Sequence, residues 1–333
     1  WINKGKATDL EGYIDALATI GNPVFHEIAA DRGGEVFYGE LSAIPYITQE
    51  QLDTCVNGIV GPLLADATTN VIISLDGSTS ACEWGEDPEA PEGSNLYGAS
   101  QLPQLRTRDY VGNSNNSYRL SNAQQPIEGF PSIMGPVGYE GQQQFLRTRI
   151  GHLMVEERKA ASDGLSETPL FDLETIKGLM YANRVYGAEV TLDDILQFCA
   201  SSEIETLTTV CRILAQWDRR VDLESQGAQV FTEFWKALGS KLGGGFQGVI
   251  SNDTFWRIDY DPADPLKTPS GIDLDITSNQ TLLTEVLLKA EAQLQSNGVL
   301  LDAPWSEVQY LERNNENVPI HGGSGTMGVY GAI

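Results

Sequence analysis

Residues 111–120, with the sequence VGNSNNSYRL, place five consecutive Asn and Ser side chains, Asn113 to Ser117, between apolar residues. A side-chain amide is a neutral hydrogen-bond donor whose protonation does not change with pH. It can therefore stabilise the negative charge that develops on a reacting oxygen, as in the oxyanion holes of acyl-transfer enzymes. A solvent-exposed polar turn is the alternative, because Asn and Ser are also common in turns. The pattern alone leaves both interpretations open.

Other residues that could act in catalysis are scarce. The chain has three histidines, His26, His152 and His321, and no Gly-x-Ser-x-Gly sequence, which argues against a Ser-His-Asp hydrolase site. Residues 323–328 (GSGTMG) match the Gly-x-Gly-x-x-Gly pattern, but a dinucleotide-binding loop needs an acidic residue about 20 positions later. Only five residues follow, so we interpret this segment as a flexible glycine-rich connection.

Three aspartates, Asp259, Asp261 and Asp264, lie close together in the sequence DYDPADP. A calcium-binding EF-hand loop would require Gly at its sixth position and Glu at its twelfth. Asp264 and Ser270 occupy those positions, so we interpret the aspartates as a solvated acidic turn. From residue spacing we expect no metal ion and no cofactor.

The charge of the chain excludes one class of partner. Acidic residues outnumber basic ones 46 to 21, which gives a formal net charge of −25. Nucleic-acid binding needs clustered Lys and Arg, so such a partner is not expected. No apolar run reaches the roughly 20 residues that a membrane-spanning helix requires, so no membrane partner is expected either.

The four cysteines, Cys55, Cys82, Cys199 and Cys211, include no Cys-x-x-Cys pair, which argues against a zinc site. An even number of cysteines in an acidic sequence of secreted type favours two disulfides, for which three pairings exist. We expect the pairs that are close in sequence, Cys55–Cys82 and Cys199–Cys211. Four buried thiols in a cytosolic protein are the alternative.

The first part of the chain mixes a helix, a hairpin and a long loop. A helix is predicted at 8–20, where Thr8 and Glu11 have the spacing of a capping box, and another at 48–57. Two short strands are predicted on either side of residues 31–34, where Gly supplies the positive φ that a hairpin turn needs. Residues 76–104 are rich in Gly, Pro, Ser and acids, which predicts a loop.

Beyond residue 165 the pattern is mostly helical, without a βαβ alternation or a repeat of fixed period. The predicted helices span residues 172–183, 191–201, 203–217, 231–242 and 281–296. The last of them has an apolar face that we expect to be buried, formed by Leu283, Val286, Leu287, Ala290 and Leu294. A bond between Cys199 and Cys211 would connect two consecutive helices.

Several stretches together resemble the penicillin acylase family of N-terminal-nucleophile hydrolases, and most closely its branch of acyl-homoserine-lactone and aculeacin acylases. The resemblance runs in order from about residue 10 to residue 333. The stretches that carry it are SACEWGEDPEAPEG, LPQLRTRDYVGNSNNSYRLSNAQQPIEGFP, LRTRIG, LAQWDRRVDLESQGAQVFTEFW and VPIHGGSGTMGVYGAI.

The resemblance implies a precursor that is exported and cut into an α and a β chain. The new N-terminal residue of the β chain, usually Ser, attacks an amide, and its own α-amino group acts as general base. A tetrahedral oxyanion forms and is stabilised by a backbone N–H and a side-chain amide, and water then releases the acid from the acyl-enzyme. Such a protein is expected to be periplasmic or secreted.

The resemblance also assigns roles to single residues. Asn115 would supply the side-chain donor of the oxyanion hole, and Asn113, Ser114 and Asn116 would hold its loop. Arg147 in LRTRIG would orient the site. The neighbouring Arg149 is a second candidate for this role, and a surface arginine paired with an acidic residue is the alternative.

Residues 21–26 (GNPVFH) match a stretch that lines the acyl pocket in relatives, where Pro-Trp-Val-Asn is frequent. Val24 replaces the Trp and His26 replaces the Asn, so a substrate preference cannot be transferred directly. Val24 and Phe25 are the acyl-pocket residues that the resemblance implies. The start of an ordinary strand is the alternative interpretation.

The nucleophile is expected upstream of Trp1, because Trp1 has neither hydroxyl nor thiol. The chain would then be an internal-to-C-terminal fragment of the β subunit, with the α chain and the N-terminal part of the β chain as partners. The expected fold is α+β, an incomplete four-layer αββα core with a large helical lobe. Residues 1–160 would belong to the core, 161–318 to the helical lobe, and 319–333 would return to the core sheet.

The expected activity is hydrolysis of a linear amide between a hydrophobic acyl group and a polar amine. Acyl-homoserine lactones or lipopeptides are the first choice of substrate, and penicillin or cephalosporin side chains the second. The fragment alone is expected to be inactive. The alternatives are a non-catalytic secreted binding protein of the same fold and a cysteine-linked helical interaction module that folds alone.

Overall fold

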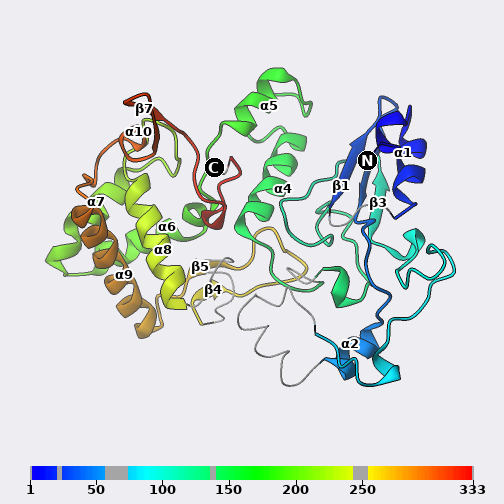
Figure 1. The fold of residues 1–333 in the computed structure, drawn as a ribbon. Coiled ribbons are helices and arrows are strands. Elements are labelled where there is room, and N and C mark those ends of the chain that lie inside the picture. The colour runs from blue at the N-terminus through cyan, green and yellow to red at the C-terminus, as the bar shows by residue number, and fades with distance from the viewer. Residues whose placement is uncertain (1, 21–24, 57–73, 136–139, 243–253, 332–333) are drawn as a thin grey trace. The chain divides into compact units, whose positions relative to one another are not determined.

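The computed structural model describes residues 2–20, 25–56, 74–135, 140–242 and 254–331. The chain divides into two compact units, Trp1–Gln142 and Gln143–Ile333. Their elements are labelled in Figure 1. The structure contains both helices and sheets, in agreement with the expected α+β class.

Unit 1 is built on a three-stranded antiparallel sheet in the order β1-β2-β3. Its strands are β1 (Glu27–Ala30), β2 (Val36–Gly39) and β3 (Gln104–Thr107). Its α-helices are α1 (Leu10–Leu17) and α2 (Gln49–Cys55), and its 3-10 turns are η1 (Lys4–Lys6), η2 (Ser80–Cys82), η3 (Ala99–Gln101) and η4 (Ser132–Met134). The core includes Phe37, Tyr38, Leu102, Tyr118 and Met134.

The predicted hairpin between β1 and β2 is confirmed. Gly34 has φ +84°, and its N–H donates to the carbonyl oxygen of Asp31 at 3.2 Å. The carboxylate of Asp31 accepts from the N–H of Glu35 at 3.1 Å. The turn sets a register in which Tyr38 pairs with Ile28 on one side and Leu105 on the other. This register places the end of β2 next to the start of β1.

Both helices predicted in unit 1 are present, and a polar side chain caps the start of each. The predicted capping box at Thr8 is wrong, because Asp9 caps α1 and its carboxylate accepts from the N–H of Gly12 at 2.8 Å. An ionised carboxylate is the stronger acceptor for an N–H at a helix start. At α2, Thr48 and Gln51 form the capping box.

Unit 2 is mainly helical. Its α-helices are α4 (Leu146–Lys159), α5 (Leu173–Met180), α6 (Tyr186–Ser201), α7 (Thr208–Gln216), α8 (Ala228–Leu242), α9 (Thr277–Ser296) and α10 (Trp305–Val308). Two small antiparallel sheets pair β4 (Trp256–Ile258) with β5 (Ser270–Ile272), and β6 (Tyr310–Arg313) with β7 (Glu316–Pro319). The 3-10 turns are η5 (Glu205–Leu207) and η7 (Gly325–Met327).

The core of unit 2 lies between helices that pack side by side, with α8 against α9 in Figure 1. All five apolar residues predicted for the buried face of α9 are buried, which confirms that prediction. They contact a core that includes Phe231, Phe234 and Trp235 of α8. Aliphatic side chains at helical spacing therefore meet an aromatic surface.

Both predicted disulfides are present. The sulfur atoms of Cys55 and Cys82 are 2.07 Å apart, and those of Cys199 and Cys211 are 2.01 Å apart. The second bond connects α6 to α7, as expected from the helical pattern. The alternative of four buried thiols is therefore wrong.

The structure divides the chain at residues 142 and 143, earlier than the expected boundary after residue 160. The reason lies in α4, whose side chains Leu146, Ile150 and Met154 belong to the core of unit 2. Met327 and Val329, from the C-terminal segment, join the same core. The assignment of these parts to a catalytic core and a helical lobe stays a prediction. Among the described residues, no helix combines the length and the apolar character needed to span a membrane.

Candidate functional site

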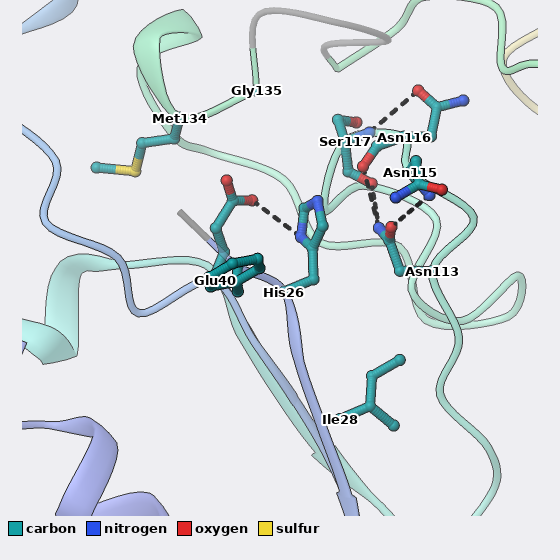
Figure 2. A pocket seen from close by; sticks show the side chains of 10 residues that line it. His26, Ile28, Glu40, Asn113, Asn115, Asn116, Ser117, Met134 and Gly135 are labelled. Carbon is teal, nitrogen blue, oxygen red and sulfur yellow. Dashed lines mark hydrogen bonds and ion pairs between the residues drawn. The ribbon is translucent and has the colours of Figure 1, made fainter. Parts of the chain in front are cut away.

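Unit 1 contains a pocket of about 490 Å³ that includes the Asn-Ser segment. One wall comes from the start of β1 and the end of β2, another from the Asn-Ser loop, and a third from the segment at η4 (Figure 2). The lining residues are Phe25, His26, Ile28, Glu40, Asn113, Asn115, Asn116, Ser117, Met134 and Gly135.

Asn115 is held in an unusual backbone conformation at the edge of this pocket. Its φ is +59°, a left-handed value that Asn tolerates better than most residues. The side-chain oxygen of Asn113 accepts from the N–H of Asn115 at 2.8 Å. The same amide of Asn113 donates to the carbonyl oxygens of Asn116 at 3.0 Å and Ser117 at 3.3 Å. Asn113 therefore fixes the turn, while Asn115 is exposed and lines the pocket.

The segment that follows Asn115 is buried and hydrogen-bonded. Asn116 and Ser117 are only 4% and 5% exposed, and the side-chain oxygen of Asn116 accepts from the N–H of Ser117 at 3.0 Å. Asn122 is fully buried, and its amide donates to the carboxylate of Asp109 at 3.1 Å and to the carbonyl of Tyr110 at 2.8 Å. These bonds connect the two ends of the loop and make it a rigid support for Asn115.

The opposite wall of the pocket is polar. The Nδ1 atom of His26 lies 2.7 Å from the hydroxyl of Tyr38 and 3.6 Å from Oε2 of Glu40. The nearby amide of Asn113 acts to lower the pKa of the Tyr38 hydroxyl, against the larger effect of burial. On this wall the contacts run from Glu40 through His26 to Tyr38.

Burial keeps this wall uncharged at neutral pH. It raises the pKa of Glu40 from 4.5 to about 8 and lowers the pKa of His26 below 6.5. The pKa of Tyr38 is raised well above 10, first by burial and then by the nearby Glu40. At pH 7 the carboxyl and the hydroxyl therefore keep their protons, and His26 is neutral.

Apolar side chains complete the pocket. Phe25 and Ile28 are half-exposed, at 50% and 48%, whereas Met134 is buried. Exposed aromatic and aliphatic surface next to polar groups is typical of a site for a molecule with an apolar part. Phe25 thus lines a pocket in the same unit as Asn115, while Val24 lies outside the described residues.

The two arginines of LRTRIG both lie on α4 of unit 2. Arg149 is fully buried, and its guanidinium donates to the carbonyl oxygens of Leu266 at 2.8 Å and Pro269 at 3.0 Å. It also lies 5.0 Å from the ring centre of Tyr186, and burial lowers its pKa. These contacts connect α4 to α6 and to the segment before β5. Arg147 is partly exposed, and its orienting role stays a prediction.

The glycine-rich segment and the aspartate cluster singled out in the sequence both make structural hydrogen bonds. The GSGTMG segment contains η7, where the indole N–H of Trp235 donates to the carbonyl of Thr326 at 2.9 Å. In DYDPADP, the carboxylate of Asp261 accepts from the N–H of Ala263 at 2.8 Å, within an exposed turn. The described residues contain no group of three His, Cys, Asp or Glu side chains that could hold a metal ion.

Tyr38 and Glu40 were not predicted as site residues from the sequence. A signal was present, because residues two apart on an extended segment point to the same side. Tyr38 and Glu40 have this spacing in VFYGE, and a Glu after an aromatic strand residue stands out in such a segment. Their meeting with His26 depends on the hairpin register, which the sequence determines only through its turn.

The chain is similar to a family model and to several known proteins. A model of the penicillin amidase family matches residues 1–332. The acyl-homoserine lactone acylase PvdQ of Pseudomonas fluorescens (strain Pf0-1) is 31% identical over 334 residues, and that of Pseudomonas savastanoi pv. phaseolicola is 31% identical over 339. Aculeacin-A acylase of Actinoplanes utahensis is 32% identical over 345 residues.

Each of these alignments covers 100% of this chain but only 39% or 40% of the relative. The matched part therefore includes both units described above. It contains the Asn-Ser loop and the other residues that line the pocket. The family identified from sequence motifs is confirmed, and the chain belongs to the penicillin amidase family.

Proposed function

We propose that the protein containing this chain is an amidohydrolase that cleaves a linear amide through an acyl-enzyme, and that Asn115 supplies a side-chain donor to the oxyanion. The observation that carries the proposal is the position of Asn115. Its side chain lines the pocket, while the loop behind it is buried and hydrogen-bonded. A donor fixed before the reaction needs no reorganisation when negative charge develops.

The fold proposed for the whole protein is the four-layer αββα core of N-terminal-nucleophile hydrolases. Its nucleophile, general base and second oxyanion donor would come from a part of the protein outside residues 1–333. The partners of this chain would be the α chain and the N-terminal part of the β chain. Arg147 is proposed to orient the site. A periplasmic or secreted location agrees with the two disulfides.

The proposed substrate has a hydrophobic acyl group and a polar amine. The names of the relatives, which are acylases of acyl-homoserine lactones and of aculeacin A, favour these two classes, with penicillin and cephalosporin side chains next. The apolar surface of Phe25 and Ile28 is suited to an acyl chain. Asn115 would then lie where the amide carbonyl becomes an oxyanion.

The test is performed on the full-length gene. Asn115→Ala and Asn115→Gly should be processed and folded as wild type, and kcat for an acyl amide should fall about 100- to 1,000-fold, the usual effect of losing one oxyanion donor. The glycine variant keeps the left-handed backbone without strain. Asn315→Ala, at an exposed position with φ +63° between β6 and β7, is the matched control for replacing a left-handed Asn.

Three results would contradict the proposal. Wild type that releases no acid from any acyl amide would favour a binding protein. A mature protein in which no chain begins with Ser, Thr or Cys would exclude the proposed nucleophile. Full activity in both Asn115 variants would exclude Asn115 as the donor.

A further inference from the structure

The polar wall of the pocket determines where the proton of His26 lies. The Nδ1 atom of His26 is 2.7 Å from the hydroxyl of Tyr38, so one of these two groups must donate to the other. Tyr38 has a single proton and keeps it, because burial raises its pKa well above 10.

The direction of this hydrogen bond follows from the other partners. If Nδ1 carried the proton and donated to Tyr38, the hydroxyl proton of Tyr38 would need another acceptor, and no bond from it to another described residue is seen. If Tyr38 donates to Nδ1, both groups are satisfied. Neutral His26 then carries its proton on Nε2.

Nε2 faces the pocket. The two contacts of the ring with Tyr38 and Glu40 both use Nδ1, and the side chain is 28% exposed. In Figure 2 the second ring nitrogen points away from Glu40, toward the side of the pocket where Ser117 is labelled. Within the described part of the chain, Nε2 has no hydrogen-bond partner. It is therefore a donor directed into the space that Asn115 also lines.

We propose that His26 is a specificity-determining residue, whose Nε2–H donates to a hydroxyl or carbonyl oxygen that the acyl chain carries close to the scissile amide. This inference rests on the proposed function, because it uses Asn115 to locate the amide. The preferred substrates would be acyl amides with such an oxygen, over acyl chains of equal length without it.

Because the groups of the polar wall are neutral, the wall favours an uncharged oxygen on the acyl chain over a carboxylate. Glu40 stands behind His26, and its Oε2 atom is buried without a hydrogen-bond partner in the described residues. Burial raises its pKa to about 8, so at neutral pH the carboxyl is protonated. An imidazole between two neutral groups stays neutral and offers one N–H. A carboxylate on the acyl chain would lose its water and find no cation on this wall.

The test compares two substrates on the mature, processed protein. One is a straight-chain acyl amide, and the other is the same amide with a carbonyl on the third carbon of the acyl chain. Wild type should prefer the oxygen-bearing substrate in kcat/KM by about tenfold, the worth of one hydrogen bond. His26→Leu should abolish the preference, because it should lower kcat/KM for the oxygen-bearing substrate about tenfold more than for the plain one. His26→Gln, which retains an N–H donor, should keep part of it.

The control is Ile28→Ala, which removes apolar contact from the same pocket without changing a donor. It should slow both substrates in proportion. Cleavage of both substrates without a preference in wild type, or with an unchanged preference in His26→Leu, would overturn the role of His26 and leave the proposed function standing. Failure of wild type to cleave either substrate would overturn both.

A measurement on wild type is independent of how the variants fold. The ¹⁵N chemical shifts of labelled histidine at pH 7 report which ring nitrogen is protonated, and His26→Gln assigns the signal. Protonated Nε2 and unprotonated Nδ1 would support the proposal. The opposite tautomer would overturn it, because Nε2 would then be an acceptor.

Discussion

Replacement of Glu40 by Gln tests the charge state on which the polar wall depends. The two side chains have the same shape, but Gln has no ionisable group. The side chain of Glu40 is 18% exposed, and burial raises its pKa from 4.5 to about 8. We therefore expect Glu40→Gln to become more stable relative to wild type as the pH rises.

The sign follows from proton binding. The pKa of Glu40 is higher in the folded state than in the unfolded state, so between pH 4.5 and 8 the folded state binds more protons at this site. Stability must then fall as the pH rises through this interval. Each pH unit costs about 1.4 kcal/mol, so the penalty is below about 1 kcal/mol at pH 5 and reaches about 4 kcal/mol at pH 8. Water that enters around the ionised group would reduce this upper value.

Amide hydrogen exchange of β1 and β2, measured on the mature protein, gives the free energy of local opening. Wild type and variant are compared at each pH, so that the intrinsic pH dependence of exchange cancels. The exchange rate of wild type divided by that of Glu40→Gln should grow as the pH rises from 5 to 8. A constant offset would reflect the buried amide of Gln, and only the slope measures the ionisation of Glu40.

Glu92→Gln is the control, because Glu92 is an exposed carboxyl in the same unit. It should give the same exchange as wild type at each pH. If the curves of Glu40→Gln and wild type run parallel from pH 5 to 8, the pKa of Glu40 does not rise on folding, and Glu40 is ionised at neutral pH. The polar wall would then be charged, and the assignment of the Nε2 proton would lose its basis.

Two further predictions concern the loop and the helical unit. Asn113→Ala should lower kcat about 100-fold with little change in KM, because the backbone N–H of Asn115 loses the acceptor at 2.8 Å that fixes it. Asn113→Asp keeps that acceptor and should therefore retain more activity than Asn113→Ala. Equal kcat in wild type and both variants would exclude this role of Asn113. Replacing Cys199 and Cys211 by Ser should destabilise unit 2 by about 3 kcal/mol, the loop-closure entropy for a separation of 12 residues. Amide hydrogen exchange of α6 and α7 measures this loss. Unchanged protection of these amides would show that packing alone holds the two helices together.

The features that the sequence predicted correctly depend on neighbours in the chain. The hairpin at residues 31–34 needs only Gly34 and Asp31 at the right positions. The disulfide between Cys199 and Cys211 connects consecutive helices, so the pairing follows from proximity in sequence. The buried face of α9 repeats with the period of the helix itself.

The features that were missed depend on contacts between distant segments. No periodic pattern marked α4 as a helix of unit 2, because charged residues interrupt its apolar side chains and two of its arginines, Arg149 and Arg158, are buried. Arg149 is buried because the carbonyl oxygens of Leu266 and Pro269 meet it, more than 100 positions later. Such acceptors cannot be recognised before the chain is folded.

The three asparagines of the Asn-Ser loop have different environments, which answers the question that their spacing raises. Asn116 is buried, and its side-chain oxygen accepts from the N–H of Ser117, whereas Asn115 is exposed and lines the pocket. The side-chain oxygen of Asn113 accepts from the N–H of Asn115, while its amide N–H groups donate to the carbonyl oxygens of Asn116 and Ser117. A reversed amide would break all of these bonds at once, so one side-chain orientation of Asn113 fixes the loop that carries Asn115. Replacement of Asn113 should therefore disturb the catalytic geometry without removing the proposed donor itself.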